Sequence, residues 1–507
     1  MSREYLEDAM QEISDEYLEE AVEWKPAEAR VIAKKQKTQQ KGTLEMARGR
    51  KQVHGWRVAV ALVTAVAVIA AAAFGIGDFR FGRKSSVLKA FAISEAEYPK
   101  ASPYPDPAKY FGGEGSTRFE EDYELWSQER RERRGLASVY KDSLDDFWTR
   151  SITTFLTGSE GENLVYSPVN VYFALAMSAE ITGGDTRREI LDLLGVKDVE
   201  ALREQASALW KANYMDDGAS TSILGSSLWL SEEMKYVKST LDTLAEVYYA
   251  SSYRGKMGTE QMDRALQTWL NEQTGGLLEE YVETESLDPR TVIALATTIY
   301  YQAKWTNEFS EKNTEEGIFH SPSGNVNCDF MNEYTYGGAY YWGEKFGAVS
   351  KYLDNGHSMW FVLPDEGVSV DDLLNDAEVM AFLTADSREN AKYLNIHFYL
   401  PKFDVSSRME LTDGLKRLGL TDIFDPGESD FTSLTDIGPI VLSQANHAAR
   451  VMVDEEGVTA AAYTLMQDAG AGRPPQEEIE FRLDRPFLFA IMGTGNVPLF
   501  VGVVNQP

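Results

Sequence analysis

The hydrophobic pattern separates an irregular amino-terminal part from a long carboxy-terminal body. In the body, apolar positions recur at helical spacing in segments such as SVYKDSLDDFWTRSITTFL and TRREILDLLGV. Other segments, such as SILGSSLWL, VIALATTIYYQ and SMWFVLP, alternate between apolar and polar positions or are apolar throughout, which is typical of strands. No internal repeat is present. The pattern therefore predicts an α+β fold with large sheets over residues 138–507.

One segment before the body is apolar on every side. Residues 58–77 read VAVALVTAVAVIAAAAFGIG and carry no charge. As a helix, twenty residues would span the hydrocarbon core of a bilayer, which is roughly 30 Å thick. Residues 34–57 hold eight Lys/Arg against one acidic residue, and basic residues collect on the cytoplasmic side. We predict a single-pass transmembrane helix with a cytoplasmic amino terminus and an extracellular body. A cleaved signal peptide fits less well, because the apolar stretch begins late and is long.

The flanks of this segment differ from each other. Residues 1–33 hold ten Asp/Glu against three Lys/Arg, with apolar residues at helical spacing. They predict an amphipathic helix, either a solvated tail or a docking helix for a cytoplasmic partner. Residues 78–137 predict an extracellular stalk, because prolines alternate in SPYPDP and favour extended chain. The run RRERR at 130–134 could serve as a processing site or a membrane-surface patch, but we interpret it as a solvated helix face.

Charge and composition exclude several classes of function. The 507 residues carry 49 basic and 80 acidic side chains, a formal net charge of −31. Nucleic acid is therefore not an expected partner, since its binding depends on Lys and Arg. A single cysteine, Cys328, and five scattered histidines leave no disulfide framework and no metal-ligand spacing. No GxSxG, HExxH or phosphate-loop motif is present. We expect no metal, no cofactor and no enzyme chemistry.

An unusual loop lies between two predicted strands near the carboxyl end. The segment EGVTAAAYTLMQDAGAGRPPQ separates ARVMVDE from EIEFRL, and a compact domain seldom keeps a loop of roughly twenty residues without a purpose. Its first part is small and β-compatible, with neither proline nor charge between Gly457 and Gln467. This part could join a sheet. The alternative is a tolerated, disordered surface loop.

With this loop and its neighbours, residues 138–507 resemble the serpin family. The resembling segments follow the family's order: NLVYSPVNVYFALAMSAEITGGDTRREI, ALQTWLNEQTGG, TVIALATTIYYQAKWTNEF, LPKFDVSSRMELTDGLKRLGLTDIF, HAARVMVDEEGVTAAAYT and DRPFLFAIMGTGNVPLFVGVVNQP. The resemblance implies the serpin fold: a large mixed central β-sheet A, two further sheets, about nine helices and an exposed reactive-centre loop.

The resemblance also implies a mechanism of suicide inhibition. A serine protease cuts the loop and forms an acyl-enzyme, and the cut loop then inserts into the central sheet as an extra strand. Counting fourteen residues on from Gly457 places the reactive bond at Ala471–Gly472, within one or two residues. A small residue there favours elastase-like or subtilisin-like proteases. Arg473 suggests a trypsin-like target, but Pro474 follows it, and such bonds resist cleavage.

Two groups of residues gain roles from the resemblance. The inhibitory hinge must be free of proline to enter a sheet, and it comprises Glu455, Glu456, Gly457, Val458, Thr459, Ala460, Ala461 and Ala462. The structural switch under the opening sheet, formed by the shutter and the breach, comprises Ser167, Asn170, Thr297, Trp305 and His447. Asn170 stands where serine is common and Thr297 where asparagine is common, and both retain hydrogen-bonding capacity. His447 is expected to be structural rather than a catalytic base.

The leading hypothesis is a membrane-anchored inhibitor of extracellular serine proteases, forming a covalent complex with its target. The absence of disulfides together with an uncleaved anchor suits a bacterial cell-surface protein. The alternative is a non-inhibitory serpin-fold binding or sensor domain coupled to a cytoplasmic partner through residues 1–33. The hinge favours the first, because neither proline nor charge lies between Gly457 and Gln467. An enzyme is the least favoured class.

Overall fold

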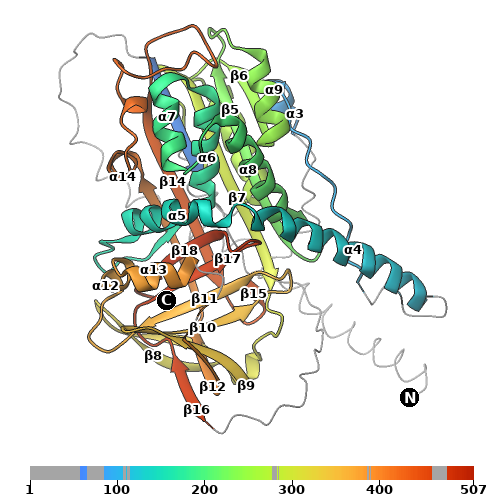
Figure 1. The fold of residues 1–507 in the computed structure, drawn as a ribbon, viewed down its shortest axis with the longest axis vertical. Helices are drawn as coiled ribbons and strands as arrows, with labels where there is room; N and C mark the ends of the chain where they lie inside the picture. Colours follow the sequence, from blue (N-terminus) through green and yellow to red (C-terminus); the bar gives the residue numbers. More distant parts are fainter. Residues whose placement is uncertain are drawn as a thin grey trace, which may run out of the picture. The chain divides into compact units, whose positions relative to one another are not determined.

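The computed structural model describes residues 58–65, 85–106, 110, 115–276, 282–283, 285–384, 388, 390–458 and 477–507. The predicted acidic tail and basic segment, residues 1–57, lie outside the described residues. The same holds for 459–476, which contain the second half of the predicted hinge and the predicted reactive bond. The described chain forms two nine-stranded sheets with helices around them (Figure 1).

The first sheet, sheet A, holds the long buried strands. Its order is β13 (Phe403–Glu410), β14 (Ile440–Val453), β1 (Val58–Ala65), β7 (Thr291–Lys304), β5 (Thr221–Ser231), β6 (Ala250–Gly255) and β2 (Ala92–Ser94). Two short strands lie off this path: β4 (Met215–Asp216) pairs with β5, and β15 (Gly457–Val458) pairs with β7. The inner residues of β5 are all buried, which explains why its sequence is largely apolar rather than strictly alternating.

The second sheet joins what we expected to be two sheets. Its order is β16 (Glu478–Arg482), β12 (Ala391–Pro401), β9 (Gly324–Trp342), β10 (Phe346–Tyr352), β11 (Ser358–Pro364), β17 (Phe487–Met492), β18 (Pro498–Val504) and β3 (Leu164–Tyr166), with β8 (Glu315–Ser321) paired to β9. The 19-residue β9 makes the sheet continuous, because it pairs with β8, β12 and β10 along its length.

The described residues contain eleven α-helices rather than about nine. They are α3 (Ser86–Lys89), α4 (Gly115–Ser138), α5 (Lys141–Leu156), α6 (Pro168–Ile181), α7 (Gly184–Leu193), α8 (Val199–Asn213), α9 (Lys238–Val247), α10 (Glu260–Thr274), α12 (Val370–Leu374), α13 (Ala377–Thr384) and α14 (Thr412–Arg417). Two 3₁₀ turns, η3 (Glu311–Asn313) and η4 (Asp422–Phe424), complete the set. The excess comes from short helices and from α4, which precedes the body.

Helix α6 lies at the centre of the main hydrophobic core. All of its residues are buried, and it contacts β7 and β18, which belong to the two different sheets. Pro168 opens the helix at a position where a missing N–H costs nothing, and the Ser167 side chain caps the helix by accepting a hydrogen bond from the N–H of Asn170. The same cap brings Ser167 beneath sheet A.

The structure describes the first eight residues of the transmembrane helix predicted over 58–77 as a strand instead. Val58–Ala65 forms β1, which runs parallel to both of its neighbours, β14 and β7, and is drawn in blue in Figure 1. A short apolar run rich in valine suits a central strand covered on both faces as well as it suits a helix, so periodicity does not separate the two. Residues 66–77 lie outside the described residues. Throughout the described segments, no helix combines the length and the apolar character needed to cross a bilayer.

The described part of residues 78–137 is also not an extended stalk. Strand β2 pairs with β6 at the edge of sheet A, and α4 packs against α8. Residues 95–106, which carry the first alternating prolines, form neither helix nor strand. The RRERR run lies on α4, with Arg131 and Arg134 exposed. The prolines led to a prediction of extended chain for the whole segment. The helix α4 lies after them and is rich in Glu and Arg, which are good helix formers.

Candidate functional site

The hinge begins with a tight turn at the end of β14. The side-chain Oδ1 of Asp454 accepts hydrogen bonds from the backbone N–H groups of Glu456 (3.0 Å) and Gly457 (3.2 Å). The N–H of Asp454 in turn donates to the carbonyl of Gly457 at 3.2 Å. Burial raises the pKa of Asp454, and the backbone donors oppose that rise. The turn reverses the chain and sends it back along sheet A as β15.

Strand β15 contains two residues of the predicted hinge, Gly457 and Val458. It runs antiparallel to β7, with Gly457 opposite Lys304 and Val458 opposite Ala303. Gly457 has φ = +156°, and a Cβ atom there would lie 2.6 Å from the carbonyl oxygen of Ala303 and 2.7 Å from the Cα of Lys304. Val458 is completely buried. The backbone approach therefore requires glycine, and the next side chain already belongs to the core.

Trp305, which follows β7, donates two hydrogen bonds to the hinge turn. Its indole Nε1–H donates to the carbonyl of Asp454 at 2.9 Å, and its backbone N–H donates to the carbonyl of Glu456 at 3.1 Å. The N–H of Phe309 donates to the carbonyl of Glu455 at 2.9 Å. Three successive carbonyls, those of Asp454, Glu455 and Glu456, thus accept hydrogen bonds from one segment, and the structure places the sequence-predicted Trp305 directly against the hinge.

Two ion pairs surround the hinge that the sequence did not suggest. Glu455 lies 2.8 Å from Lys402 and accepts a 2.7 Å hydrogen bond from the Thr314 hydroxyl. Burial raises the pKa of Glu455, but these two donors outweigh burial and lower it overall. Nearby, Lys351 pairs with Glu333 at 2.6 Å and lies 4.2 Å from the centre of the Phe309 ring.

Burial lowers the pKa of Lys351, and Glu333 opposes this. The partners in both pairs come from distant parts of the chain, so no local pattern could have revealed them. Lys402 supplies the countercharge for the buried hinge carboxylate of Glu455, and Glu333 supplies the one for the buried ammonium group of Lys351.

The shutter residues meet below the middle of sheet A. The N–H of Ser167 donates to Nε2 of His447 at 3.1 Å, and Asn170 Nδ2 donates to the carbonyl of Thr297 at 3.4 Å. All four residues are buried. Burial lowers the pKa of His447 to about 3, so the imidazole is neutral and its Nε2 accepts. Asn170 Oδ1 and Thr297 Oγ1 find no hydrogen-bond partner among the described residues.

Between β7 and β14, sheet A contains two inserted segments. Strand β1 pairs with β7 over Thr291–Thr297, near the start of β7, while β15 pairs with its last two residues. The pairing of β1 with β14 reaches from Ile440 to Ala448. Different parts of the chain therefore pair with the two ends of β7: β1 near its start and β15 at its end.

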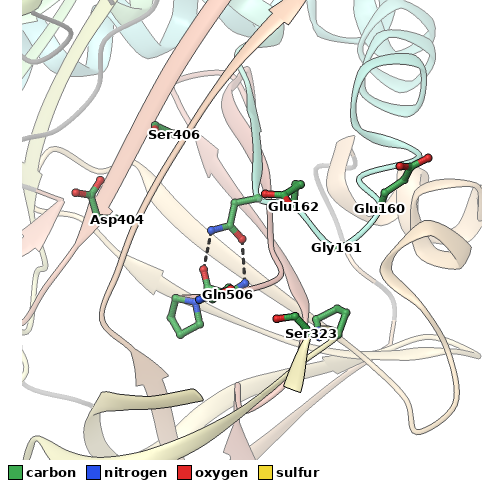
Figure 2. Close-up of a pocket in the computed structure, with 10 residues that line it drawn as sticks. Glu160, Gly161, Glu162, Ser323, Asp404, Ser406 and Gln506 are labelled. Atoms are coloured by element: carbon green, nitrogen blue, oxygen red, sulfur yellow. Dashed lines mark hydrogen bonds between the residues drawn. The ribbon is translucent and has the colours of Figure 1, made fainter. Parts of the chain in front are cut away.

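A polar cavity elsewhere on the body offers no catalytic arrangement. It has a volume of about 480 Å³ and is lined by Glu160, Gly161, Glu162, Asn163, Pro322, Ser323, Asp404, Ser406, Gln506 and Pro507. Asn163 and Gln506 are joined by two hydrogen bonds, of 2.6 and 2.9 Å, which hold the carboxyl end of the chain. Figure 2 marks the hydrogen bonds at Gln506 with dashed lines. Asp404 is engaged by Arg450. No lining residue forms a nucleophile–base pair of the kind used in hydrolysis.

The two sheets and the hinge turn define a protein in which the short strand β15, paired to the central strand β7, directly precedes residues 459–476. The family described as Serpin (serine protease inhibitor) matches residues 142–507. The chain is 28% identical over 385 residues to the plasma serine protease inhibitor of Mus musculus, covering 73% of this chain and 92% of that protein. It is also 28% identical over 371 residues to Serpin-ZX of Arabidopsis thaliana, covering 69% and 94%.

A solved structure agrees with these sequence matches. The thermophilic serpin tengpin in its native state matches with a TM-score of 0.64 and 26% identity, covering 72% of this chain and 93% of that chain. The protein belongs to the serpin family. Its relatives are protease inhibitors rather than enzymes, which places the chain outside the enzyme classes.

Proposed function

We propose that the protein inhibits serine proteases by covalent trapping. A protease cuts the loop near Ala471–Gly472 and forms an ester through its serine, releasing the new amino terminus. The freed loop then extends β15 between β7 and β14 and carries the protease with it. One observation carries the proposal: the hinge residues Gly457 and Val458 already pair with β7 as a strand, and the Val458 side chain is completely buried. The following residues, Thr459–Ala462, are small enough to continue it.

The proposed targets are elastase-like or subtilisin-like proteases. Ala471 presents a methyl group to the specificity pocket, which suits a shallow pocket better than a deep acidic one. Arg473 would suit a trypsin-like pocket, but Pro474 follows it, and a bond to proline resists these enzymes. This assignment rests on the sequence register that begins at Gly457.

A denaturing gel tests the proposal. The full chain is mixed with an elastase-like, a subtilisin-like and a trypsin-like protease, and we expect a band at the summed mass that survives boiling with one of the first two. Mass spectrometry of the released peptide should show cleavage after Ala471. Cleavage of the loop with full recovery of protease activity would contradict trapping.

A hinge variant shows whether strand entry is required. Val458→Arg places a charge where the wild-type side chain is completely buried, and burying an unpaired charge is very costly. We expect this variant to be cleaved as a substrate, with covalent complex reduced at least tenfold. Val458→Thr is the matched control, since it keeps the β-branched shape and should retain most of the complex.

We further propose that residues 58–77 anchor the protein in a membrane, with residues 1–33 facing the cytoplasm. The charge-free apolar stretch and the eight basic residues before it support this arrangement. Since 58–65 cannot be β1 and a membrane helix at once, anchoring requires β1 to leave sheet A. Membrane fractionation of the full chain, with protease digestion from one side, tests this. Recovery of the intact chain entirely in the non-membrane fraction would contradict it.

A further inference from the structure

Helix α4 makes specific contacts with the body through its second half. It precedes residue 142, where the family match begins, and it packs against α8 (Figure 1). The indole of Trp126 donates through Nε1 to Oδ2 of Asp217 at 3.0 Å. The Tyr104 ring meets the same indole edge-on at 5.2 Å, and the guanidinium of Arg130 lies 4.4 Å from its centre. Trp126 is thus the centre of a docked aromatic and cationic contact.

Asp217 connects this contact to the body. Its side chain is largely buried, and while Oδ2 accepts from Trp126, Oδ1 accepts from the N–H groups of Ala219 (3.0 Å) and Ser220 (2.9 Å). The Ser220 hydroxyl then donates to Oδ1 of Asp354 at 2.9 Å. A continuous series of hydrogen bonds therefore leads from α4 to Asp354.

The arginines of α4 reach the same place directly. Arg130 Nη1 donates to the carbonyl of Asp354 at 3.4 Å. A Cβ atom added to Gly356 would lie 2.9 Å from Nη2 of Arg130 and 2.6 Å from Nη2 of Arg134. Both guanidinium groups therefore lie against the turn that contains Asp354 and Gly356. Arg133 adds a 3.0 Å hydrogen bond to the carbonyl of Tyr214. The turn after β10 is therefore covered by α4.

This turn holds the end of β7 at the hinge. The N–H of Asp354 donates to the carbonyl of Lys304 at 2.9 Å, and the N–H of Lys304 donates back to Oδ1 of Asp354 at 3.3 Å. Leu353 forms a β-bridge with Trp305. Lys304 is the residue opposite Gly457, and Trp305 binds the hinge carbonyls.

We propose that α4 is an intramolecular strap that restrains the opening of sheet A at the hinge end of β7. An added strand enters only if β7 separates from what fills the gap beside it. The turn at Asp354 is bonded both to Lys304 and to α4, so it resists movement of that end of β7. Releasing α4 frees the turn and speeds strand entry. The proposal builds on the loop insertion proposed above, but its measurement needs no protease.

The experiment compares three variants of the full chain. Trp126→Ala removes the indole and its hydrogen bond to Asp217, and Arg130→Ala removes the contact with the Asp354 turn. Arg131→Ala is the matched control, because Arg131 lies one residue away on α4, is exposed, and within the described part of the chain bonds to Ser127 and Glu124 of its own helix. Both test residues are only half-buried, so their truncation leaves the core intact.

Two rates are measured on each variant. The first is the rate at which a fluorescent peptide with the sequence of residues 457–467 anneals to the protein. The second is hydrogen exchange at the N–H groups of Lys304 and Asp354. We expect Trp126→Ala and Arg130→Ala to raise both rates about five- to tenfold, the effect of losing one or two such contacts. The control should match the wild type, and the melting temperature should change little in all three.

Two results would overturn the strap. One is unchanged exchange at Lys304 and Asp354 in a variant whose α4 amides have themselves become fast, because α4 would then be released without consequence. The other is equal acceleration by Arg131→Ala, because the effect would then follow helix stability rather than the contact with the body. If the wild type anneals no peptide, the exchange rates alone decide the matter, whether or not the chain traps a protease.

Discussion

At the scale of single residues, Gly457 is the position with the least freedom. A Cβ atom there would meet backbone atoms of Ala303 and Lys304 at 2.6 and 2.7 Å, and backbone cannot rotate away as a flexible side chain can. We predict that Gly457→Ala weakens the hinge pairing by about 1–3 kcal/mol. Because the N–H of Trp305 donates to Glu456 next door, its hydrogen exchange should accelerate and report the loss.

Gly135→Ala provides the control for this substitution. Gly135 lies in α4, and a Cβ atom there meets nothing within 4 Å. Alanine is the better helix former by up to about 1 kcal/mol, so the control should leave Trp305 protected and α4 slightly more stable. Equal exchange of Trp305 in both variants would contradict the steric explanation.

The buried His447 should make the stability of the native state depend on pH. Burial lowers its pKa to about 3, whereas an unfolded histidine titrates near pH 6.5. The unfolded chain therefore binds the extra proton first, and the native sheet loses stability as the pH falls below about 6.5. At pH 5 this one residue should cost about 2 kcal/mol.

Urea unfolding at pH 7 and pH 5 tests this effect. His447→Gln removes the titrating group, so the pH dependence should shrink by about 2 kcal/mol, whatever the variant's stability at pH 7. His320→Gln, at an exposed position, is the control and should keep the wild-type dependence. A wild-type dependence in His447→Gln would show that the histidine is not held neutral. His357 is buried with a pKa lowered to about 3 as well, so both variants retain its share.

At the scale of elements, most strands of the body follow from their sequence. The segments SILGSSLWL and SMWFVLP became β5 and β11, because strands buried on both faces carry long apolar runs. Strand β9 was not predicted, because most of its residues are partly or fully exposed and glycines at 337 and 338 interrupt its sequence pattern. Residues 58–65 were predicted as part of a membrane helix, because an eight-residue apolar run suits both a membrane helix and a buried strand. In the structure they form a strand because they pair with β14 and β7, which lie far away in the sequence.

The residues of the site likewise divide into those that the sequence predicted and those that it did not. Trp305 and the shutter residues were identified from a family pattern and lie where long strands cross the core. Lys351, Lys402 and Asp354 were missed, because their significance comes only from contacts across more than one element. A resemblance names the residues that a family shares, whereas countercharges particular to one chain emerge only from packing.

The turn at Asp354 gives a prediction at the element scale. Burial raises the pKa of this carboxyl to about 6, although the Ser220 hydroxyl and the N–H of Lys304 oppose the rise. Since the folded pKa exceeds the unfolded value of 3.8, the native state binds the proton first, and its stability increases as the pH falls from 7 through 6. Asp354→Asn should therefore be more stable than wild type at pH 7, by about 1–2 kcal/mol.

The advantage of Asp354→Asn should diminish by pH 4.5, where the wild-type carboxyl is largely protonated. Urea unfolding at both pH values measures it. Asp413→Asn, at an exposed position in α14, is the control and should show no such convergence. An Asp354→Asn variant whose difference from wild type is the same at both pH values would contradict burial as the cause.

At the scale of the whole molecule, β1 and the hinge strand β15 both pair with β7 in one sheet. Strand β1 pairs with β14 and β7, the strands that an inserting loop would have to join. We predict that a chain beginning at Ser85 inserts its cut loop faster than the full chain. Upon reaction with a protease, the ratio of covalent complex to cleaved inhibitor should rise. A chain that lacks only residues 1–57 keeps β1 and should behave as the full chain does.

The position of β1 has a thermodynamic consequence. Two segments that occupy one gap act as competing ligands, and whatever binds one of them favours the other by the same free energy. A lipid bilayer that takes up the apolar residues of β1 would therefore act as an effector of loop insertion, and loop insertion would in turn strengthen membrane binding. The chain would be most reactive where it is most firmly embedded, so proteases would be captured at the membrane surface rather than away from it.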